Sequence, residues 1–347
     1  MKIVLICPSN MLYMPYVKNY EPLLKERDID YNIINWDRFG IEEISEFSYR
    51  DNKVGHQRNF FDYYKYKKFI IKHLNSVKYD KIIVFGIQLS FFLKEILQKK
   101  FIGNYIIDIR DYNKILKIFN PIKTIETSSF VTISSPAYKE WLPISDKYIV
   151  NHNTNIRSID RLIEPKIYNK KEISISYIGA LANFQENRDF INSLKGSSKF
   201  LLKFHGQGTI NNKLEEYIKE YNIGNVEIYD RYEKSEESEL YIQADLINMI
   251  LYNKNINDKT CLSNRLYNSA LYGRPMVAIS GTHISEVINM YNLGLVINSY
   301  DSMEQKLLNY LSRINIDEYN KGRIIFLNKV LKENMTFIEK FTDFLIN

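Results

Sequence analysis

Short apolar runs alternate with helix-length polar segments along the first half of the chain. The runs lie at residues 2–7, 31–35, 81–85, 105–109, 130–134 and 147–150. Because each run is apolar throughout and helical crossovers separate the runs, we expect parallel strands whose two faces are both covered by helices. The first half therefore predicts a doubly wound α/β domain.

A second series of apolar runs follows, at residues 173–178, 200–205, 226–229, 244–250, 276–279 and 295–297. It predicts another open parallel sheet. Residues 151–171 are polar and contain one proline, which is typical of an interdomain connection. The end of the chain has a helical pattern of apolar positions, namely Phe337, Phe341, Phe344 and Leu345. We therefore expect a first domain, a linker, a second domain and a terminal helix at residues 1–155, 156–171, 172–332 and 333–347.

The most informative segment lies late in the second series. Ser263 is a good helix N-cap, Gly273 ends the helical pattern, and Pro275 leads into the next apolar run. This order fixes the start of a short helix at the carboxyl end of one strand, beside another strand. Ligands bind at this edge of open parallel sheets, and a helix N-terminus favours a phosphate there. The segment therefore predicts a pocket for a diphosphate.

Residues 263–275, with the sequence SNRLYNSALYGRP, resemble the donor-binding motif of GT-B glycosyltransferases. The resemblance is to the family-4-like enzymes of bacterial capsule, O-antigen and exopolysaccharide assembly. It implies an α/β protein with two doubly wound Rossmann-like domains that face a cleft, and a C-terminal helix that crosses back to the first domain. It also implies a nucleotide-sugar donor, with UDP as the expected nucleotide, bound by the second domain, and an acceptor bound by the first. Retention of the anomeric configuration would follow from the same resemblance.

The chain departs from the family pattern at several charged positions. The ribose-binding glutamate of the family aligns with Asn268, and its partner glutamate eight positions earlier aligns with Thr260. The phosphate-binding arginine and lysine of the family align with Ala180 and about Gln185. Another residue must therefore supply the positive charge that binds the phosphate, and Arg265 and Arg188 are the candidates. Fixed N–H groups and an arginine can stabilise a departing diphosphate, so we expect no cofactor and no metal.

The resemblance places the donor contacts where strands of the second domain end or helices begin. The expected residues are Gly179, Gly206, Gly208, Arg231, Tyr232, Asn264, Arg265, Asn268, Thr282 and His283. Several of them have an alternative structural interpretation. Gly206 and Gly208 suit a tight turn, and Thr282 suits a helix N-cap. Tyr232 could stack on a base or be an ordinary half-buried tyrosine.

In the first domain, Arg110 and Asp111 follow the strand at residues 105–109. We expect both to be catalytic, because a carboxylate at this place can accept or orient the proton of an acceptor hydroxyl. An Arg-Asp ion pair that closes a loop is the alternative interpretation. Acceptor contacts are expected from Ser9, Asn10, His56 and Arg58.

The net charge of +6 lies entirely in residues 1–150. Within residues 53–81, lysines alternate with phenylalanine and tyrosine. This pattern is typical of a basic amphipathic helix that rests on anionic lipid headgroups. A solvated helix with one face in the core explains the pattern equally well. No nucleic-acid motif accompanies the charge, so we expect no nucleic-acid partner.

Other sequence features limit where the protein works. No apolar run approaches the roughly 18–20 residues that cross a bilayer. The N-terminus turns polar too abruptly for a signal peptide. Cys7, Cys261 and the scattered histidines lack the spacing of a metal site. We expect a cytoplasmic protein that is peripheral on the inner face of the cell membrane if the basic helix binds lipid.

These patterns lead to one hypothesis and two alternatives. The hypothesis is a glycosyltransferase that moves a sugar from a nucleotide donor to a glycan or polyprenyl-diphosphate-linked acceptor in bacterial surface polysaccharide synthesis. The two absent glutamates motivate the first alternative, a non-catalytic GT-B partner subunit of another transferase. The second alternative is a sugar-nucleotide epimerase, which would turn over the donor without an acceptor.

Overall fold

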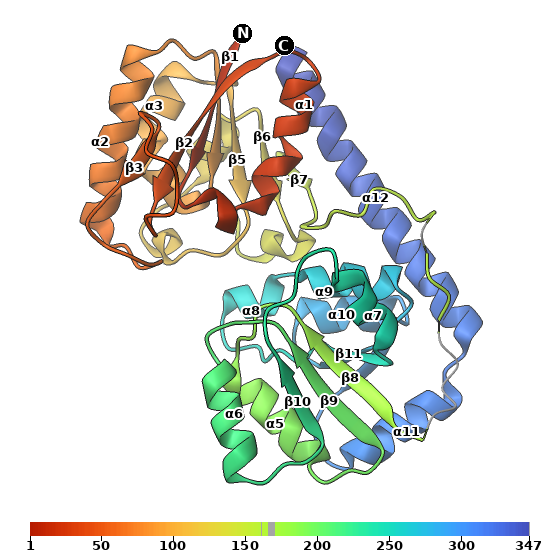
Figure 1. The fold of residues 1–347 in the computed structure, drawn as a ribbon. Helices are drawn as coiled ribbons and strands as arrows, with labels where there is room; N and C mark the ends of the chain where they lie inside the picture. Colours follow the sequence, from red (N-terminus) through yellow and green to blue (C-terminus); the bar gives the residue numbers. More distant parts are fainter. Residues whose placement is uncertain (161, 166–170, 347) are drawn as a thin grey trace. The chain divides into compact units, whose positions relative to one another are not determined.

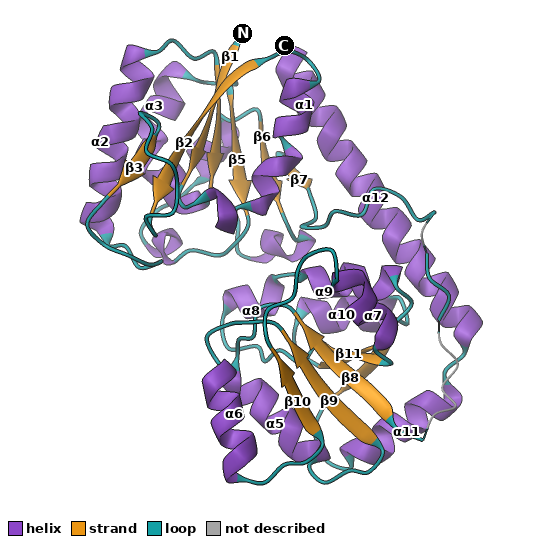
Figure 2. Cartoon of the chain, viewed as in Figure 1, coloured by secondary structure: helices purple, strands orange, loops and turns teal. Residues whose placement is uncertain are grey.

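The computed structural model describes residues 1–160, 162–165 and 171–346. The chain forms two compact units, Met1–His152 with Glu333–Asn347, and Asn153–Lys332. Each unit has a parallel sheet with helices on both faces (Figures 1 and 2). The linker predicted at residues 156–171 includes 161 and 166–170, which lie outside the described residues.

The first unit contains a seven-stranded parallel sheet in the order β3-β2-β1-β4-β5-β6-β7. Its strands are β1 (Lys2–Cys7), β2 (Asp30–Asp37), β3 (Ser48–Arg50), β4 (Lys81–Phe85), β5 (Tyr105–Ile109), β6 (Phe130–Ile133) and β7 (Tyr148–Val150). The apolar runs predicted the strands β1, β4 and β5 with these bounds. The edge strand β3 was not predicted, because it has only three residues and one of them is the exposed Arg50.

Helices cover both faces of this sheet. They are α1 (Glu21–Lys25), α2 (Phe60–Ser76), α3 (Ile87–Lys100), α4 (Ile122–Glu126) and the 3-10 helices η1 (Met11–Tyr13), η2 (Pro15–Asn19), η3 (Lys114–Lys117) and η4 (Pro136–Glu140). Successive residues of β1 point to opposite faces. Val4 and Ile6 pack with α2 and α3, whereas Ile3 and Leu5 pack with α1 and the end of the last helix. Both faces are therefore apolar, which explains the continuous apolar runs.

The second unit contains a six-stranded parallel sheet in the order β10-β9-β8-β11-β12-β13. Its strands are β8 (Ile173–Ile178), β9 (Phe200–His205), β10 (Val226–Tyr229), β11 (Leu246–Asn248), β12 (Met276–Ile279) and β13 (Gly294–Ile297). Its helices are α5 (Phe184–Leu194), α6 (Asn211–Glu220), α7 (Glu237–Gln243), α8 (Ile256–Thr260), α9 (Asn264–Leu271), α10 (His283–Met290) and α11 (Met303–Arg313). Helices α5, α6 and α11 pack on one face, and α7, α9 and α10 pack on the other.

Strand β11 is shorter than the predicted run at residues 244–250. Ala244 still donates its N–H to Leu240 at the end of α7. After the strand, the side chain of Asn248 accepts a hydrogen bond from the N–H of Ile250 over 2.9 Å, so this N–H is used locally and not by the sheet. Local hydrogen bonds at both ends therefore limit the strand to three residues.

The last helix, α12 (Ile316–Ile346), begins in the second unit, and its residues from Glu333 onward belong to the first. It contains the predicted helix at residues 333–347, except Asn347, which is outside the described residues. Phe337, Phe341 and Phe344 are buried in the core of the first unit. In the second unit, the buried Arg323 of α12 donates to the carbonyls of Ala270 and Leu271 and so caps the C-terminus of α9. Within the described ranges, no helix has the length and apolar character that a membrane span needs.

Candidate functional site

In the second unit, the residues predicted to hold a diphosphate lie at the carboxyl edge of the sheet. Gly179 follows β8 with a φ of +132°, and nothing lies within 4 Å of the position that a Cβ would occupy there. A glycine with open space in front of its backbone lets a ligand approach closely. Gly179 is thus well placed for the role expected from the sequence.

The glycines after β9 have a different function. A Cβ on Gly206 would stand 2.1 Å from the carbonyl oxygen of Gly179, and one on Gly208 would stand 2.0 Å from that of Leu181. The turn at residues 206–208 therefore packs its backbone directly on the turn after β8. This geometry supports the structural interpretation of the two glycines as turn residues.

Helix α9 begins where the sequence predicted. Ser263 occupies the N-cap position with φ −92° and ψ 155°, but its side chain makes no capping hydrogen bond. Its buried Oγ has no hydrogen-bond partner. The start of α9 therefore has no side-chain cap of the kind that Asn59 provides on α2, a property that it shares with α3, α5, α6, α7 and α11.

Arg265 is held firmly in the first turn of α9. Its guanidinium carbon lies 3.6 Å from the centre of the Tyr177 ring, at the end of β8. Its Nη1 donates to the carbonyl oxygen of Asn248, at the end of β11, over 2.9 Å. The arginine is thus oriented by two neighbouring strands at their carboxyl ends. By contrast, Arg188, the other candidate cation, pairs with its neighbour Asp189.

Asn268 lies one turn further along α9 and contacts a carboxylate that the sequence did not indicate. Its Nδ2 donates to Oε2 of Glu237, the first residue of α7, over 3.3 Å. The Tyr232 hydroxyl donates to Oε1 of the same carboxylate over 3.2 Å. Burial, and then the charge of Glu237, raise the pKa of the Tyr232 hydroxyl above its ordinary value. The hydroxyl therefore remains a hydrogen-bond donor at neutral pH.

A second unpredicted carboxylate is Glu186 in the first turn of α5. It is completely buried, Lys254 donates to its Oε2 over 2.8 Å, and its Oε1 has no hydrogen-bond partner. Burial, and then the charge of Glu186, raise the pKa of Asp258. The sequence could not identify the Glu186–Lys254 pair, because its members are far apart in the chain and lie in polar segments.

The remaining expected donor residues differ in their surroundings. Thr282 is the N-cap of α10 and forms a capping box with Ser285, so its structural interpretation is supported. The ring of His283 contacts the carboxylate of Glu286 over 2.9 Å. Arg231 and Asn264 are exposed.

In the first unit, Arg110 pairs with Asp108 and not with its neighbour Asp111. The guanidinium donates to both carboxylate oxygens of Asp108, over 2.5 and 2.7 Å, and to the backbone and side-chain oxygens of Asn151. Burial alone would lower the pKa of Arg110, but the charge of Asp108 outweighs this and raises it. The guanidinium is thus engaged within the unit, and the catalytic role expected for Arg110 stays a prediction. Its function here is to fix the loop that carries Asp111.

Asp111 lines a pocket of about 150 Å³ at the carboxyl ends of β1, β4 and β5. The pocket is also lined by Pro8, Tyr16, Gly86, Gln88 and Asn113. The strand order reverses between β1 and β4, and such a switch point is the usual ligand site of an open α/β sheet. Asp111 is therefore at a place where a small hydroxyl-bearing group could bind.

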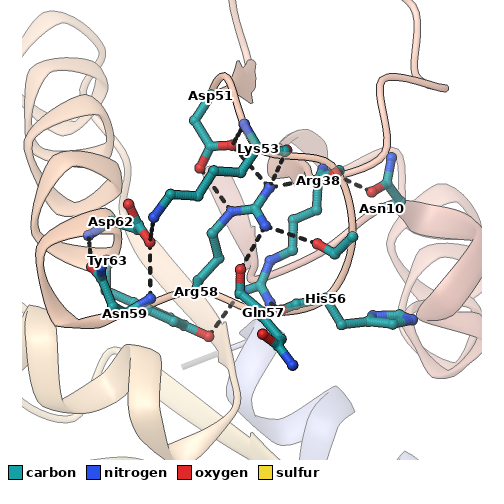
Figure 3. A network of polar contacts seen from close by, with 11 residues as sticks. Asn10, Arg38, Asp51, Lys53, His56, Gln57, Arg58, Asn59, Asp62 and Tyr63 are labelled. Carbon is teal, nitrogen blue, oxygen red and sulfur yellow. Dashed lines mark hydrogen bonds and ion pairs between the residues drawn. The ribbon is translucent and has the colours of Figure 1, made fainter.

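Two of the four expected acceptor residues have structural functions instead (Figure 3). Arg58 has a side chain that is 1% exposed, pairs with Asp51 over 2.7 Å and donates to several carbonyls of its loop. Asn10 is completely buried, donates to Asp37 and accepts from the N–H of Arg38. Both side chains are thus engaged within the first unit, and their expected acceptor contacts stay predictions.

The other two expected acceptor residues have surroundings that suit a ligand. Ser9 has a buried Oγ without a hydrogen-bond partner. His56 is exposed, and its ring contacts the rings of Tyr13 and Phe39 at centroid distances of 5.1 and 4.7 Å. Both remain candidates for acceptor contacts.

No family profile and no curated protein sequence matches the chain. Solved structures match over its full length. Sucrose-phosphate synthase from Thermosynechococcus elongatus has a TM-score of 0.72 at 10% identity, and the match covers 100% of this chain and 99% of that one. The lipopolysaccharide outer core galactosyltransferase WaaB in its apo form has a TM-score of 0.67 at 16% identity, with the same coverage.

A third similar structure is Anabaena HepE in complex with UDP and glucose. Its TM-score is 0.63 at 11% identity, and the match covers 99% of this chain and 100% of that one. These neighbours are GT-B glycosyltransferases. At such identities the similarity concerns the arrangement of the backbone. The chain therefore has the GT-B fold, with two parallel-sheet Rossmann-like units joined by a last helix that belongs to both.

Proposed function

We propose that this protein is a glycosyltransferase that uses a nucleotide-sugar donor. The observation that carries the proposal is Arg265, which is fixed over Tyr177 and against the carbonyl of Asn248 beside the start of α9. Negative charge grows on the diphosphate as it leaves a sugar, and pre-oriented N–H groups and a guanidinium stabilise that charge without reorganising. The same groups can act without a metal ion. The open space at Gly179 gives the donor room to approach.

The donor is proposed to be UDP-linked, and the acceptor a glycan or a polyprenyl-diphosphate-linked oligosaccharide of surface polysaccharide synthesis. Anabaena HepE, whose fold this chain shares, was solved with UDP and glucose. The acceptor hydroxyl is proposed to bind in the pocket of the first unit, near Asp111 and Ser9. Retention of configuration is the expected stereochemical outcome.

Replacing Arg265 by alanine is expected to weaken UDP binding and to lower kcat/KM for the donor by roughly 30-fold. This is the effect of losing a charge-assisted hydrogen bond of about 2 kcal/mol. Arg265→Lys should recover only part of the loss, because an ammonium cannot stack flat on Tyr177. Titration calorimetry with UDP and the release of nucleoside diphosphate in the presence of a lipid-linked acceptor would measure both quantities.

Arg313→Ala, at the end of α11, is the matched control and should change neither quantity. Unchanged kinetics in Arg265→Ala would remove this residue from the donor site. If the purified wild-type protein bound no nucleoside diphosphate, the alternative of a non-catalytic partner subunit would be favoured. Donor turnover without acceptor would favour an epimerase.

We also propose that helix α2 contacts an anionic membrane surface. The helix begins with the exposed Phe60, Phe61 and Tyr64, of which Phe61 is 72% exposed. Lys65 and Lys68 are exposed beside them. Aromatic side chains next to lysines suit the boundary between acyl chains and anionic headgroups. The opposite side of the helix, including Tyr66 and Ile70, is buried in the core and holds α2 in place.

The double substitution Phe61→Asp with Tyr64→Asp is expected to abolish most binding to vesicles of phosphatidylglycerol and phosphatidylcholine. The change removes apolar contact and adds charge that the lipid repels. Vesicle co-sedimentation measures the bound fraction. Ile118→Asp is the control, because Ile118 is 73% exposed but lies outside α2. Equal binding by all three proteins would leave α2 as a solvated helix.

A further inference from the structure

Glu237 places a half-buried carboxylate beside α9. Its side chain is 16% exposed, although it belongs to a strongly charged segment of the sequence. The Asn268 amide and the Tyr232 hydroxyl each donate to a different oxygen of the carboxylate. The ammonium of Lys234, which is 68% exposed, contacts Oε2 as well. The carboxylate is therefore oriented by two donors from other segments, and its remaining partner is a solvated lysine.

The contact with Asn268 matters because α9 itself has no carboxylate on this side. Asn268 lies in the middle of α9, and its amide carries no charge. Glu237, from a helix 31 residues earlier in the chain, returns a negative charge to within hydrogen-bond distance of the same position.

The location fits the ribose of a nucleotide whose diphosphate lies at the start of α9. Asn268 is four residues after Asn264, which corresponds to about 6 Å along the helix axis. A ribose is joined to its diphosphate through a single CH₂–O link, so its hydroxyls extend over a comparable distance. Tyr232, whose hydroxyl donates to the same carboxylate, is partly buried three residues after β10.

We propose that Glu237 accepts hydrogen bonds from the 2′- and 3′-hydroxyls of the donor ribose, with Asn268 and Tyr232 holding its carboxylate in position. The inference rests on the proposed function and adds to it the residue that selects ribonucleotides. A carboxylate has two acceptor oxygens and can take both hydroxyls of a cis-diol, and charge assistance strengthens each bond. Lys234 turns to solvent when the ribose takes its place.

The experiment compares a ribonucleotide with its 2′-deoxy counterpart. A thermal-shift screen of UDP, GDP and ADP first selects the nucleoside diphosphate that stabilises the protein most. Calorimetry then gives the dissociation constants of that nucleotide and its 2′-deoxy form for the wild type, Glu237→Gln and Glu239→Gln. Glu239 is the matched control, because it lies on the same helix, loses the same charge and is exposed.

In the wild type and Glu239→Gln, the ribonucleotide should bind about tenfold more tightly than the 2′-deoxy form. In Glu237→Gln, the ribonucleotide should lose about this factor, and the two affinities should become nearly equal. A tenfold preference that persists in Glu237→Gln overturns the inference and leaves the proposed function intact. An equal loss for both nucleotides, with the preference retained, also overturns it, because Glu237 would then only support the local structure. A wild type that binds no nucleoside diphosphate overturns both proposals.

Discussion

Replacing Gly206 by alanine is expected to lower the stability of the second unit by about 4 kcal/mol. The new Cβ would stand 2.1 Å from the carbonyl oxygen of Gly179, and the residue has a φ of +132°. Overpacking against backbone costs about 1–3 kcal/mol, and the strained φ costs a similar amount. The backbone of Gly179 cannot move aside without pulling the end of β8 away from β9, because the N–H of Gly179 donates to the carbonyl of His205 over 3.0 Å.

Thermal unfolding followed by circular dichroism measures the effect. For a unit of this size, 4 kcal/mol corresponds to a decrease in Tm of roughly 8–16 °C. Gly224→Ala is the control, since a Cβ there meets open space and its φ is ordinary, and it should change stability by less than about 0.5 kcal/mol. If Gly206→Ala instead kept its Tm and lost nucleotide binding, Gly206 would serve the ligand and not the turn.

The sequence predicted those elements whose signals are local. Strands buried on both faces appear as nearly continuous apolar runs, which is why β1 and β4 were found with their bounds. Strand β3 was missed because it lies at the sheet edge and is too short to have a pattern. Helix α9 was found because a serine, a glycine and a proline mark its two ends.

The candidate site was only partly predictable, because its carboxylates come from distant segments. Glu237 lies among other glutamates, and the sequence alone cannot tell which of them turns inward. Lys254 and Glu186 are 68 residues apart and pair only in the folded unit. The same limit explains why Arg110 was expected to act beside its neighbour Asp111, although the buried Asp108 is its partner. The order of strands and helices in the sequence identifies the carboxyl edge of the sheet as the site. Which side chains pair there depends on how distant segments pack in the folded unit.

In the loop at residues 51–59, the structure uses charged side chains for contacts within the first unit, which the sequence could not show. Arg58 was expected to contact the acceptor, but it uses donors to hold the loop together, and Lys53 pairs with Asp62 of α2. Arg38 donates to the carbonyl of His56 and to the Tyr63 hydroxyl (Figure 3). The positive charges of Arg38, Lys53 and Arg58 therefore stabilise the first unit.

The substitution Asp111→Asn is expected to lower kcat by about 1,000-fold while UDP binding stays unchanged. A positioned general base contributes about 10²–10⁴ to a rate, and an amide cannot accept the proton of the acceptor hydroxyl. Asp111 lines the pocket at the carboxyl ends of β1, β4 and β5, where Arg110 and Asp108 fix the preceding residues. The donor residues lie in the second unit, so their affinity for nucleotide should not depend on this carboxylate.

The measurement combines transfer to a lipid-linked acceptor with calorimetry of UDP binding. Asp146→Asn is the matched control, because Asp146 is an exposed aspartate of the same unit that lies just before β7, at the amino end of that strand. A loss of kcat in Asp111→Asn alone, with an unchanged Kd for UDP, would separate the chemical step from donor binding. Near-normal turnover would make Asp111 a structural residue and leave Ser9 and His56 as the remaining candidates for acceptor contacts. A simultaneous loss of transfer and of Tm would instead show that the substitution disturbs the loop that the Arg110–Asp108 pair holds.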